Sequence, residues 1–193
     1  ELFEFFKKIT LDDVKEIYDR LNAKFDSWNG ESFFNDKMSE PLKMLEEKGL
    51  IKESQGAKVV DLSDYNMPPC LLVKSDGSSL YATRDIAAAI WRKKEYDFDK
   101  CLYVVAYQQN LHFKQFFKVL ELAGLPWAKD LVHVAYGMVS LEDGAMSTRK
   151  GNVVLLRDVI NKAVSKADEI ITAKNPNLPD KAKVAEQVGI GAV

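Results

Sequence analysis

The sequence is poor in cysteine and contains no long hydrophobic run. Cys70 and Cys101 are its only cysteines and form no CxxC pair, which argues against a zinc ribbon and a disulfide-dense secreted scaffold. A membrane-spanning helix needs about 20 consecutive apolar residues, and the opening ELFEFFKKIT is too short and begins too acidic to be a signal peptide. We therefore expect a cytoplasmic protein in a reducing compartment, with no membrane partner.

A large excess of one charge is also missing. The 27 Lys and Arg residues are balanced by 29 Asp and Glu residues, which gives a formal net charge of −2. This balance excludes a globally basic, histone-like DNA binder, so any contact with nucleic acid must come from a local patch. The absence of an initiating Met and the apolar ending VGIGAV indicate a piece of a longer protein.

Turn signals divide the first part of the sequence into short elements. Thr10 and Asp13 resemble a capping box before apolar residues at helical spacing, which predicts a helix over residues 11–22. FDSWNGESFFND reads as a turn-rich connector, and LKMLEEK as a short helix. LIKES and KVVDLS are expected to form a hairpin, as are the two halves of CLLVKSDGSSLYA around Asp76-Gly77.

Helices and apolar strands alternate in the middle of the sequence. Thr83 is expected to cap a helix whose apolar face includes Ile86 and Trp91, and KCLYVVAY reads as a strand buried on both faces. The helix NLHFKQFFKVLELAG and the strand LVHVAYGMV repeat this order, which is typical of a parallel, doubly wound sheet. Two further helices are predicted, in LRDVINKAVSKADEIITAK and DKAKVAEQVGIGAV.

The segment GAMSTRKGNVV concentrates hydroxyls, cations and glycine just beyond the second strand. Ligands of an open parallel sheet bind at the carboxyl ends of its strands. There Arg149 and Lys150 can close over phosphate oxygens, while the Ser147 and Thr148 hydroxyls add donors. The Walker pattern GxxxxGK[ST] is absent. From these residues alone, a solvated hairpin whose charges maintain solubility explains the segment equally well.

Other polar residues stand where helices begin. Tyr81 and Asp85 fall at the end of an extended segment and in the first turn of the next helix, so both can face one crevice. A carboxylate near a helix N-terminus is also stabilised by the helix dipole without any ligand. Gln109 and His112 occur where a strand passes into a helix, although His112 could simply pack on Phe116.

Four segments, in order, resemble motifs of arginyl-tRNA synthetases, which are class I aminoacyl-tRNA synthetases. They are FDSWNGESFF, YATRDIAAAIWR, QQNLHFKQFF and GMVSLEDGAMSTRKGNVV, the last similar to the KMSKS-type signature loop. The resemblance covers most of the chain and is weakest over residues 36–70. It implies an α/β fold: the second half of a Rossmann-like parallel-sheet catalytic domain over residues 1–158, with a small β-rich α+β insertion at 36–75. Residues 159–193 would be trailing helices leading toward an anticodon-binding domain.

The resemblance also implies an activity and residue roles. The enzymes activate L-arginine with ATP to arginyl-adenylate and transfer it to tRNA(Arg). The resemblance assigns arginine binding to Glu31, Tyr81, Asp85 and Gln109. It assigns the catalytic contacts of the loop to Ser147, Thr148, Arg149 and Lys150. It assigns ATP binding to His112, Gly137, Met138, Val139, Met146 and Gly151. We expect Mg²⁺ to enter with ATP and no protein-bound metal, because no carboxylate and histidine cluster is evident.

Two departures from the family pattern limit the expected activity. Ala145 stands where the general signature begins with Lys, so the positive charge must come from Arg149 and Lys150. The HIGH-type motif is missing, since the only histidines are His112 and His133 and neither lies in such a sequence. We therefore expect the chain alone to be inactive. Alternatives are a non-catalytic, synthetase-like tRNA-binding or regulatory protein, and an unrelated nucleotide-binding domain that carries these motifs by chance.

Overall fold

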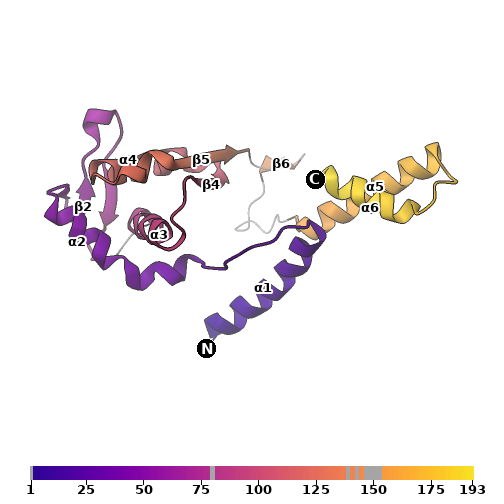
Figure 1. Cartoon of the computed structure of the whole chain (residues 1–193), viewed down its shortest axis with the longest axis horizontal. Helices are drawn as coiled ribbons and strands as arrows, with labels where there is room; N and C mark the ends of the chain where they lie inside the picture. Colours follow the sequence, from indigo (N-terminus) through magenta and orange to yellow (C-terminus); the bar gives the residue numbers. More distant parts are fainter. Residues whose placement is uncertain (1, 79–80, 138–139, 142–143, 146–153) are drawn as a thin grey trace. The chain divides into compact units, whose positions relative to one another are not determined.

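The computed structural model describes residues 2–78, 81–137, 140–141, 144–145 and 154–193 (Figure 1). The backbone divides into two compact units. One unit comprises Asn29–Met138, and the other comprises Glu1–Trp28 together with Val139–Val193. Each unit is described by itself. None of the described helices combines the length and apolar character that a membrane span requires.

The first half of the Asn29–Met138 unit contains a small antiparallel sheet. Its elements are η1 (Glu31–Lys37), α2 (Ser39–Glu47), β1 (Ile51–Ser54), β2 (Ala57–Val60), η2 (Ser63–Tyr65) and β3 (Cys70–Val73). The strand order is β1-β2-β3, and Ile51 lies opposite Val60 in the first pair. The first predicted hairpin is therefore confirmed.

The second predicted hairpin is wrong, although its turn forms. The Ser78 N–H donates to Asp76 Oδ1 at 2.8 Å, and Gly77 has a φ of +81°, which glycine tolerates. However, β3 pairs with β2, and a helix begins at Tyr81 where the returning strand was expected. The helix prevails because its apolar residues at helical spacing, such as Ala82 and Ile86, are buried in the core.

The second half of this unit is the α/β part that the sequence predicts. Its elements are α3 (Tyr81–Tyr96), β4 (Cys101–Ala106), η3 (Tyr107–Gln109), α4 (Asn110–Leu122), η4 (Pro126–Asp130) and β5 (Leu131–Tyr136). Strands β4 and β5 pair in parallel, with Cys101 opposite Leu131 and Ala106 opposite Tyr136. Parallel pairing through a crossover helix confirms the mixed α/β fold class.

Burial of β4 on both faces is not observed. Tyr103 is buried, whereas Leu102 and Val104 are 56% and 63% exposed. Tyr103 packs against Phe113 and Phe116 of α4, so this helix covers one face of the strand. Among the described residues of this unit, nothing buries the other face. The prediction was wrong because an apolar run shows that a strand can be buried, not which elements cover it.

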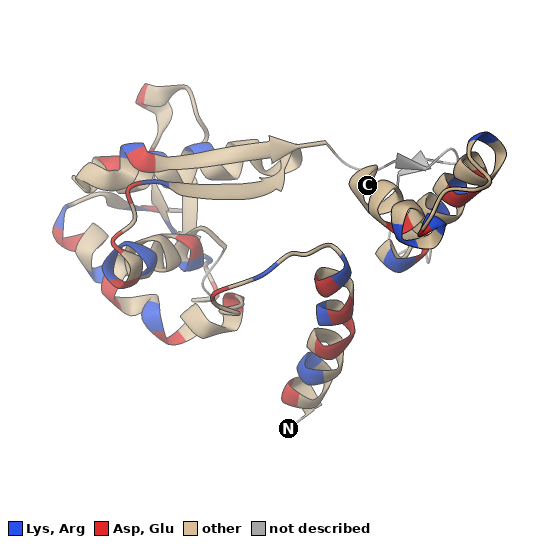
Figure 2. Cartoon of the chain, turned by 45° about the vertical axis from the view of Figure 1, so that its right-hand side comes forward, with Lys and Arg blue, Asp and Glu red and all other residues tan. Residues whose placement is uncertain are grey.

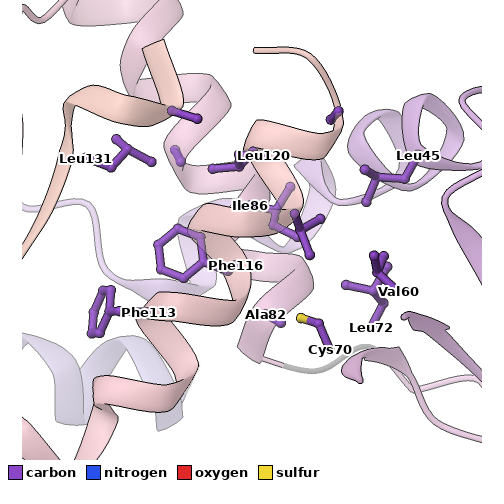
Figure 3. Close-up of a cluster of buried hydrophobic side chains, with 14 of the residues drawn as sticks. Leu45, Val60, Cys70, Leu72, Ala82, Ile86, Phe113, Phe116, Leu120 and Leu131 are labelled. Atoms are coloured by element: carbon purple, nitrogen blue, oxygen red, sulfur yellow. The ribbon is translucent and has the colours of Figure 1, made fainter. Parts of the chain in front are cut away.

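One hydrophobic core joins the small sheet to the α/β part of the unit. Figure 3 shows Phe113, Phe116 and Leu120 of α4 in this cluster with Ile86 of α3 and Leu72 of β3. These α4 positions recur at helical spacing, which explains why NLHFKQFF forms an amphipathic helix. The small sheet therefore packs on the same helices that carry the candidate site residues.

Thr83 has a different role from the predicted one. The helix begins two residues earlier, at Tyr81, so Thr83 lies inside α3 and does not cap it. Its side chain is 1% exposed, and its hydroxyl donates a 2.6 Å hydrogen bond to the Leu72 carbonyl of β3. A buried hydroxyl needs such a partner, and here the partner is supplied by the neighbouring strand.

The second unit is mainly helical. Its elements are α1 (Leu2–Arg20), β6 (Ser140–Leu141), β7 (Gly144–Ala145), α5 (Leu156–Lys174) and α6 (Lys181–Gly191). Both predicted C-terminal helices are confirmed. Helix α1 begins well before residue 11, and the Thr10 hydroxyl donates to the Phe6 carbonyl at 2.9 Å, so the predicted capping box is wrong. Acidic and basic residues are interspersed along α1 (Figure 2).

Ionic contacts tie α1 to the C-terminal helices within this unit. Arg20 Nη2 lies 2.9 Å from Glu186 Oε1 of α6, and Arg20 Nη1 donates to Asn161 Oδ1 of α5 at 3.0 Å. Arg157 of α5 reaches Asp13 of α1 at 2.6 Å. These pairs join segments more than 140 residues apart in sequence.

Candidate functional site

The start of α3 presents two of the predicted site residues. Tyr81 and Asp85 are four residues apart and therefore lie on the same face of the helix. Tyr81 is 68% exposed, and the Asp85 side chain is 36% exposed. Thr83 is buried and bonded to β3. Because Thr83 faces the core, Tyr81 and Asp85 lie on the more exposed side of the helix start.

Asp85 and His112 form a direct contact. Asp85 Oδ2 lies 2.6 Å from His112 Nε2, which joins the beginning of α3 to the first turn of α4. The His112 side chain is only 22% exposed. Its ring packs against Phe113 and Phe116, with centroid separations of 5.4 Å in both cases. Two residues that the sequence singles out separately are thus brought together across 27 positions.

Glu31 is also engaged within the chain. Its Oε2 accepts a hydrogen bond from Arg84 Nη1 at 2.8 Å, which links η1 to α3. Glu31 is 72% exposed and Arg84 23% exposed at their side chains. Arg84 Nε is buried and has no hydrogen-bond partner among the described residues. Sequence reasoning did not identify Arg84 as a partner, although it lies between Tyr81 and Asp85 in the motif YATRD.

The carboxyl ends of the two parallel strands meet at one edge of their sheet. Gln109 follows β4 and immediately precedes α4, where it makes no side-chain capping bond. Gly137 directly follows β5 and is exposed. The register that places Ala106 opposite Tyr136 brings these two strand ends side by side. In parallel sheets this edge is where ligands bind.

Most of the predicted signature loop lies outside the described residues. This applies to Met138, Val139, Met146, Ser147, Thr148, Arg149, Lys150 and Gly151. Next to these positions, β6 and β7 pair in antiparallel fashion, with Ser140 opposite Ala145. The roles of the loop residues therefore stay predictions.

No metal-binding cluster is present in the described parts of the chain. There, no three His, Cys, Asp or Glu side chains come together in a way that could hold an ion. The Asp85–His112 contact is a pair, which is short of the three or four protein ligands typical of a zinc site.

A surface cavity lies apart from these residues. It has a volume of about 210 Å³ and is lined by Asp36, Lys37, Ser39, Glu40 and Pro41 together with Ala87, Ile90, Trp91 and Lys94 of α3. None of Glu31, Tyr81, Asp85, Gln109 and His112 lines it. This cavity therefore does not coincide with the candidate site, which is defined here by its chemistry at two helix starts.

Comparisons with known proteins agree in pointing to one family. A family profile described as "tRNA synthetases class I (R), catalytic domain" matches residues 1–193. The arginine–tRNA ligases of Clostridioides difficile and Halothermothrix orenii are each 58% identical over 193 residues, covering 100% of this chain and 34% of the relative. The chain thus spans about a third of the length of these relatives.

Solved structures give the same answer for the fold. The arginyl-tRNA synthetase of Thermus thermophilus aligns with a TM-score of 0.80 at 26% identity, covering 100% of this chain and 39% of that one. The enzyme of Plasmodium falciparum aligns with a TM-score of 0.78 at 23% identity, covering 99% and 32%.

Proposed function

This chain belongs to the family of class I tRNA synthetase (R) catalytic domains, and on that premise we propose that it carries the arginine-binding part of an arginine–tRNA ligase. The complete protein would activate L-arginine with ATP and transfer the arginyl group to tRNA(Arg) in the cytoplasm. One observation supports the proposal most directly: Asp85 of α3 and His112 of α4 meet at the starts of their helices, beside Tyr81 and Gln109.

Asp85 is the proposed acceptor for the substrate guanidinium. A guanidinium offers five N–H donors in a planar fork, and a carboxylate is its natural partner. Within the described residues, His112 is the one hydrogen-bond partner of the Asp85 carboxylate, and it occupies Oδ2. Oδ1 has no such partner in these parts of the chain, and we propose that it accepts an N–H group of the substrate. Tyr81 and Gln109 add a phenol and an amide oxygen that can accept further N–H groups.

Glu31 is the fourth proposed arginine ligand. It already accepts a hydrogen bond from the guanidinium of Arg84. Binding the substrate through Glu31 would therefore exchange one guanidinium for another. The pair supports the chemistry of this role, since it shows that the Glu31 carboxylate accepts a guanidinium in this setting.

ATP is proposed to bind at the sheet edge formed by the ends of β4 and β5. Residues 137–139 would pack against the adenine, with His112, Met146 and Gly151 nearby. Ser147, Thr148, Arg149 and Lys150 would contact the phosphates, and Mg²⁺ would arrive with ATP. The arginine carboxylate attacks the α-phosphate, forming a carboxyl–phosphate bond while pyrophosphate leaves. Such a reaction depends on positioning and on charge stabilisation, which mobile cations provide.

Substitution of Asp85 tests the arginine site. In the full-length protein that carries this chain, we expect Asp85→Ala to lower kcat/KM for arginine about 10- to 100-fold, because a hydrogen bond to a charged group contributes about 1.5 to 3 kcal/mol. The measurement is arginine-dependent exchange of pyrophosphate into ATP. Asp99→Ala is the matched control, because Asp99 is an exposed carboxylate shortly before β4, at the opposite end of that strand. Unchanged arginine kinetics in Asp85→Ala would reject the assignment.

A second measurement addresses the isolated chain. We propose that it neither activates nor transfers arginine, because its sequence contains no HIGH-type motif. Calorimetric titration with arginine and with ATP, together with the exchange assay, tests this. Turnover by the isolated chain would contradict the proposal, and an inactive full-length protein that still binds tRNA would support the non-catalytic alternative.

A further inference from the structure

We infer that His112 is a positioning residue for Asp85, holding one carboxylate oxygen so that the other faces the arginine guanidinium. The inference rests on the proposed function, in which Asp85 binds arginine. It assigns His112 a role on the arginine side of the site, whereas the family resemblance places this residue near ATP.

The direction of the hydrogen bond follows from the chemistry of the two groups. An ionised carboxylate only accepts hydrogen bonds, so the proton in the 2.6 Å contact belongs to His112 Nε2. Hydrogen bonds of this kind, with an ionised acceptor, are shorter and stronger than neutral ones. His112 is therefore the donor of this contact and Asp85 Oδ2 the acceptor.

The imidazole is itself held in place by the protein core. Its ring packs at 5.4 Å from Phe116, which is 0% exposed, and at the same distance from Phe113. The His112 side chain is more buried than that of Asp85, at 22% against 36% exposed. The donor is thus anchored on α4, and the more exposed carboxylate of α3 is fixed by it.

Among the side chains that the structure describes, no cation occupies the remaining acceptor on Asp85. The adjacent Arg84 places its guanidinium on Glu31 at 2.8 Å. Within the described residues, no other side chain pairs with the Asp85 carboxylate. A carboxylate fixed through one oxygen and open at the other is prepared for a ligand before the ligand arrives, which lowers the ordering cost of binding.

Kinetic analysis of His112 variants in the full-length protein tests the inference. His112→Phe keeps an aromatic ring against Phe116 but removes the N–H donor. We expect it to raise the KM for arginine about tenfold, as for loss of one hydrogen bond to a charged group, and to change the KM for ATP less. His112→Gln places an amide N–H near the original Nε2 position, and we expect it to restore most of the arginine affinity.

Two controls separate this inference from its competitors. His133→Phe removes the other histidine, which bonds the Val105 carbonyl at 2.9 Å and stacks on Phe113 at 4.1 Å. We expect it to lower the melting temperature and leave the arginine KM unchanged. Asp85→Asn combined with His112→Phe should be no worse than Asp85→Asn alone, since the histidine acts through the carboxylate.

The outcomes distinguish the inference from the proposed function. If Asp85→Asn impairs arginine use but His112→Phe does not, the positioning role is wrong and the arginine site stands. If His112→Phe raises the KM for ATP and spares that for arginine, His112 serves ATP and the inference is overturned. Equal loss in folded His112→Gln and His112→Phe also overturns it. If Asp85→Asn has no effect on arginine, the proposed function itself fails.

Discussion

A close approach between α5 and α6 provides a sharp test of the packing argument. At Gly189 of α6, an added Cβ atom would lie 2.5 Å from Val164 Cα and 2.6 Å from Val164 N of α5. These are backbone atoms, so no side-chain rotation can relieve the clash and the two helices must separate. Overpacking of this kind costs about 1 to 3 kcal/mol. The better helix propensity of Ala returns at most about 1 kcal/mol. The clash therefore outweighs the gain in helix propensity, and the substitution is expected to destabilise the protein.

Gly189→Ala is accordingly expected to lower the free energy of unfolding by about 1 to 2 kcal/mol. Gly191→Ala is the matched control, because Gly191 lies in the same helix and an added Cβ would meet nothing within 4 Å. We expect this control to be neutral or slightly stabilising. Hydrogen exchange of the α5 and α6 amides measures the difference locally, and exchange should be faster in Gly189→Ala alone. Equal protection in the two variants would refute the reasoning.

Further predictions concern two buried polar groups. Thr83→Val leaves the Leu72 carbonyl without its donor, so the free energy of unfolding should fall by about 1 to 3 kcal/mol; denaturant titration that gives the same midpoint as Thr83→Ser would contradict this. Burial raises the pKa of the Cys70 thiol from 9.0 to about 12. Alkylation at neutral pH should therefore label Cys101 well before Cys70, and equal rates would show that Cys70 is accessible. Because the folded state retains this proton longer, the stabilisation is complete below pH 9.0 and is lost as the pH rises toward about 12; in Cys70→Ala this part of the alkaline decline should be absent.

The regular elements of the fold were predictable where the apolar period was long. Helices α3 to α6 have apolar residues at helical spacing, and the parallel strands β4 and β5 are short apolar runs, so the sequence predicted each element. The failures occurred at positions decided by distant partners. Thr83 has the chemistry of a helix cap, yet the Leu72 carbonyl, eleven residues away, takes its hydroxyl. Thr10 is a different case, because it bonds to Phe6, four residues away, inside a helix that starts earlier than its sequence signals indicate.

The individual residues of the candidate site could be predicted from the sequence, but their arrangement in space could not. Asp85 and His112 each stand at a helix start, which sequence reasoning can recognise. Their contact depends on how α3 and α4 pack, and nothing local in the sequence specifies that packing. The Glu31–Arg84 pair was missed for the same reason, since its members are 53 residues apart.

The bond from Thr83 to β3 has a consequence for how sequence changes act at a distance. Thr83 stands between Tyr81 and Asp85, and its hydroxyl fastens this turn of α3 to a strand that contributes no residue to the candidate site. The small antiparallel sheet thereby supports the turn of α3 that carries Tyr81 and Asp85. We therefore expect substitutions that shift β3 to move Asp85 and to alter affinity for the proposed arginine ligand without contacting it.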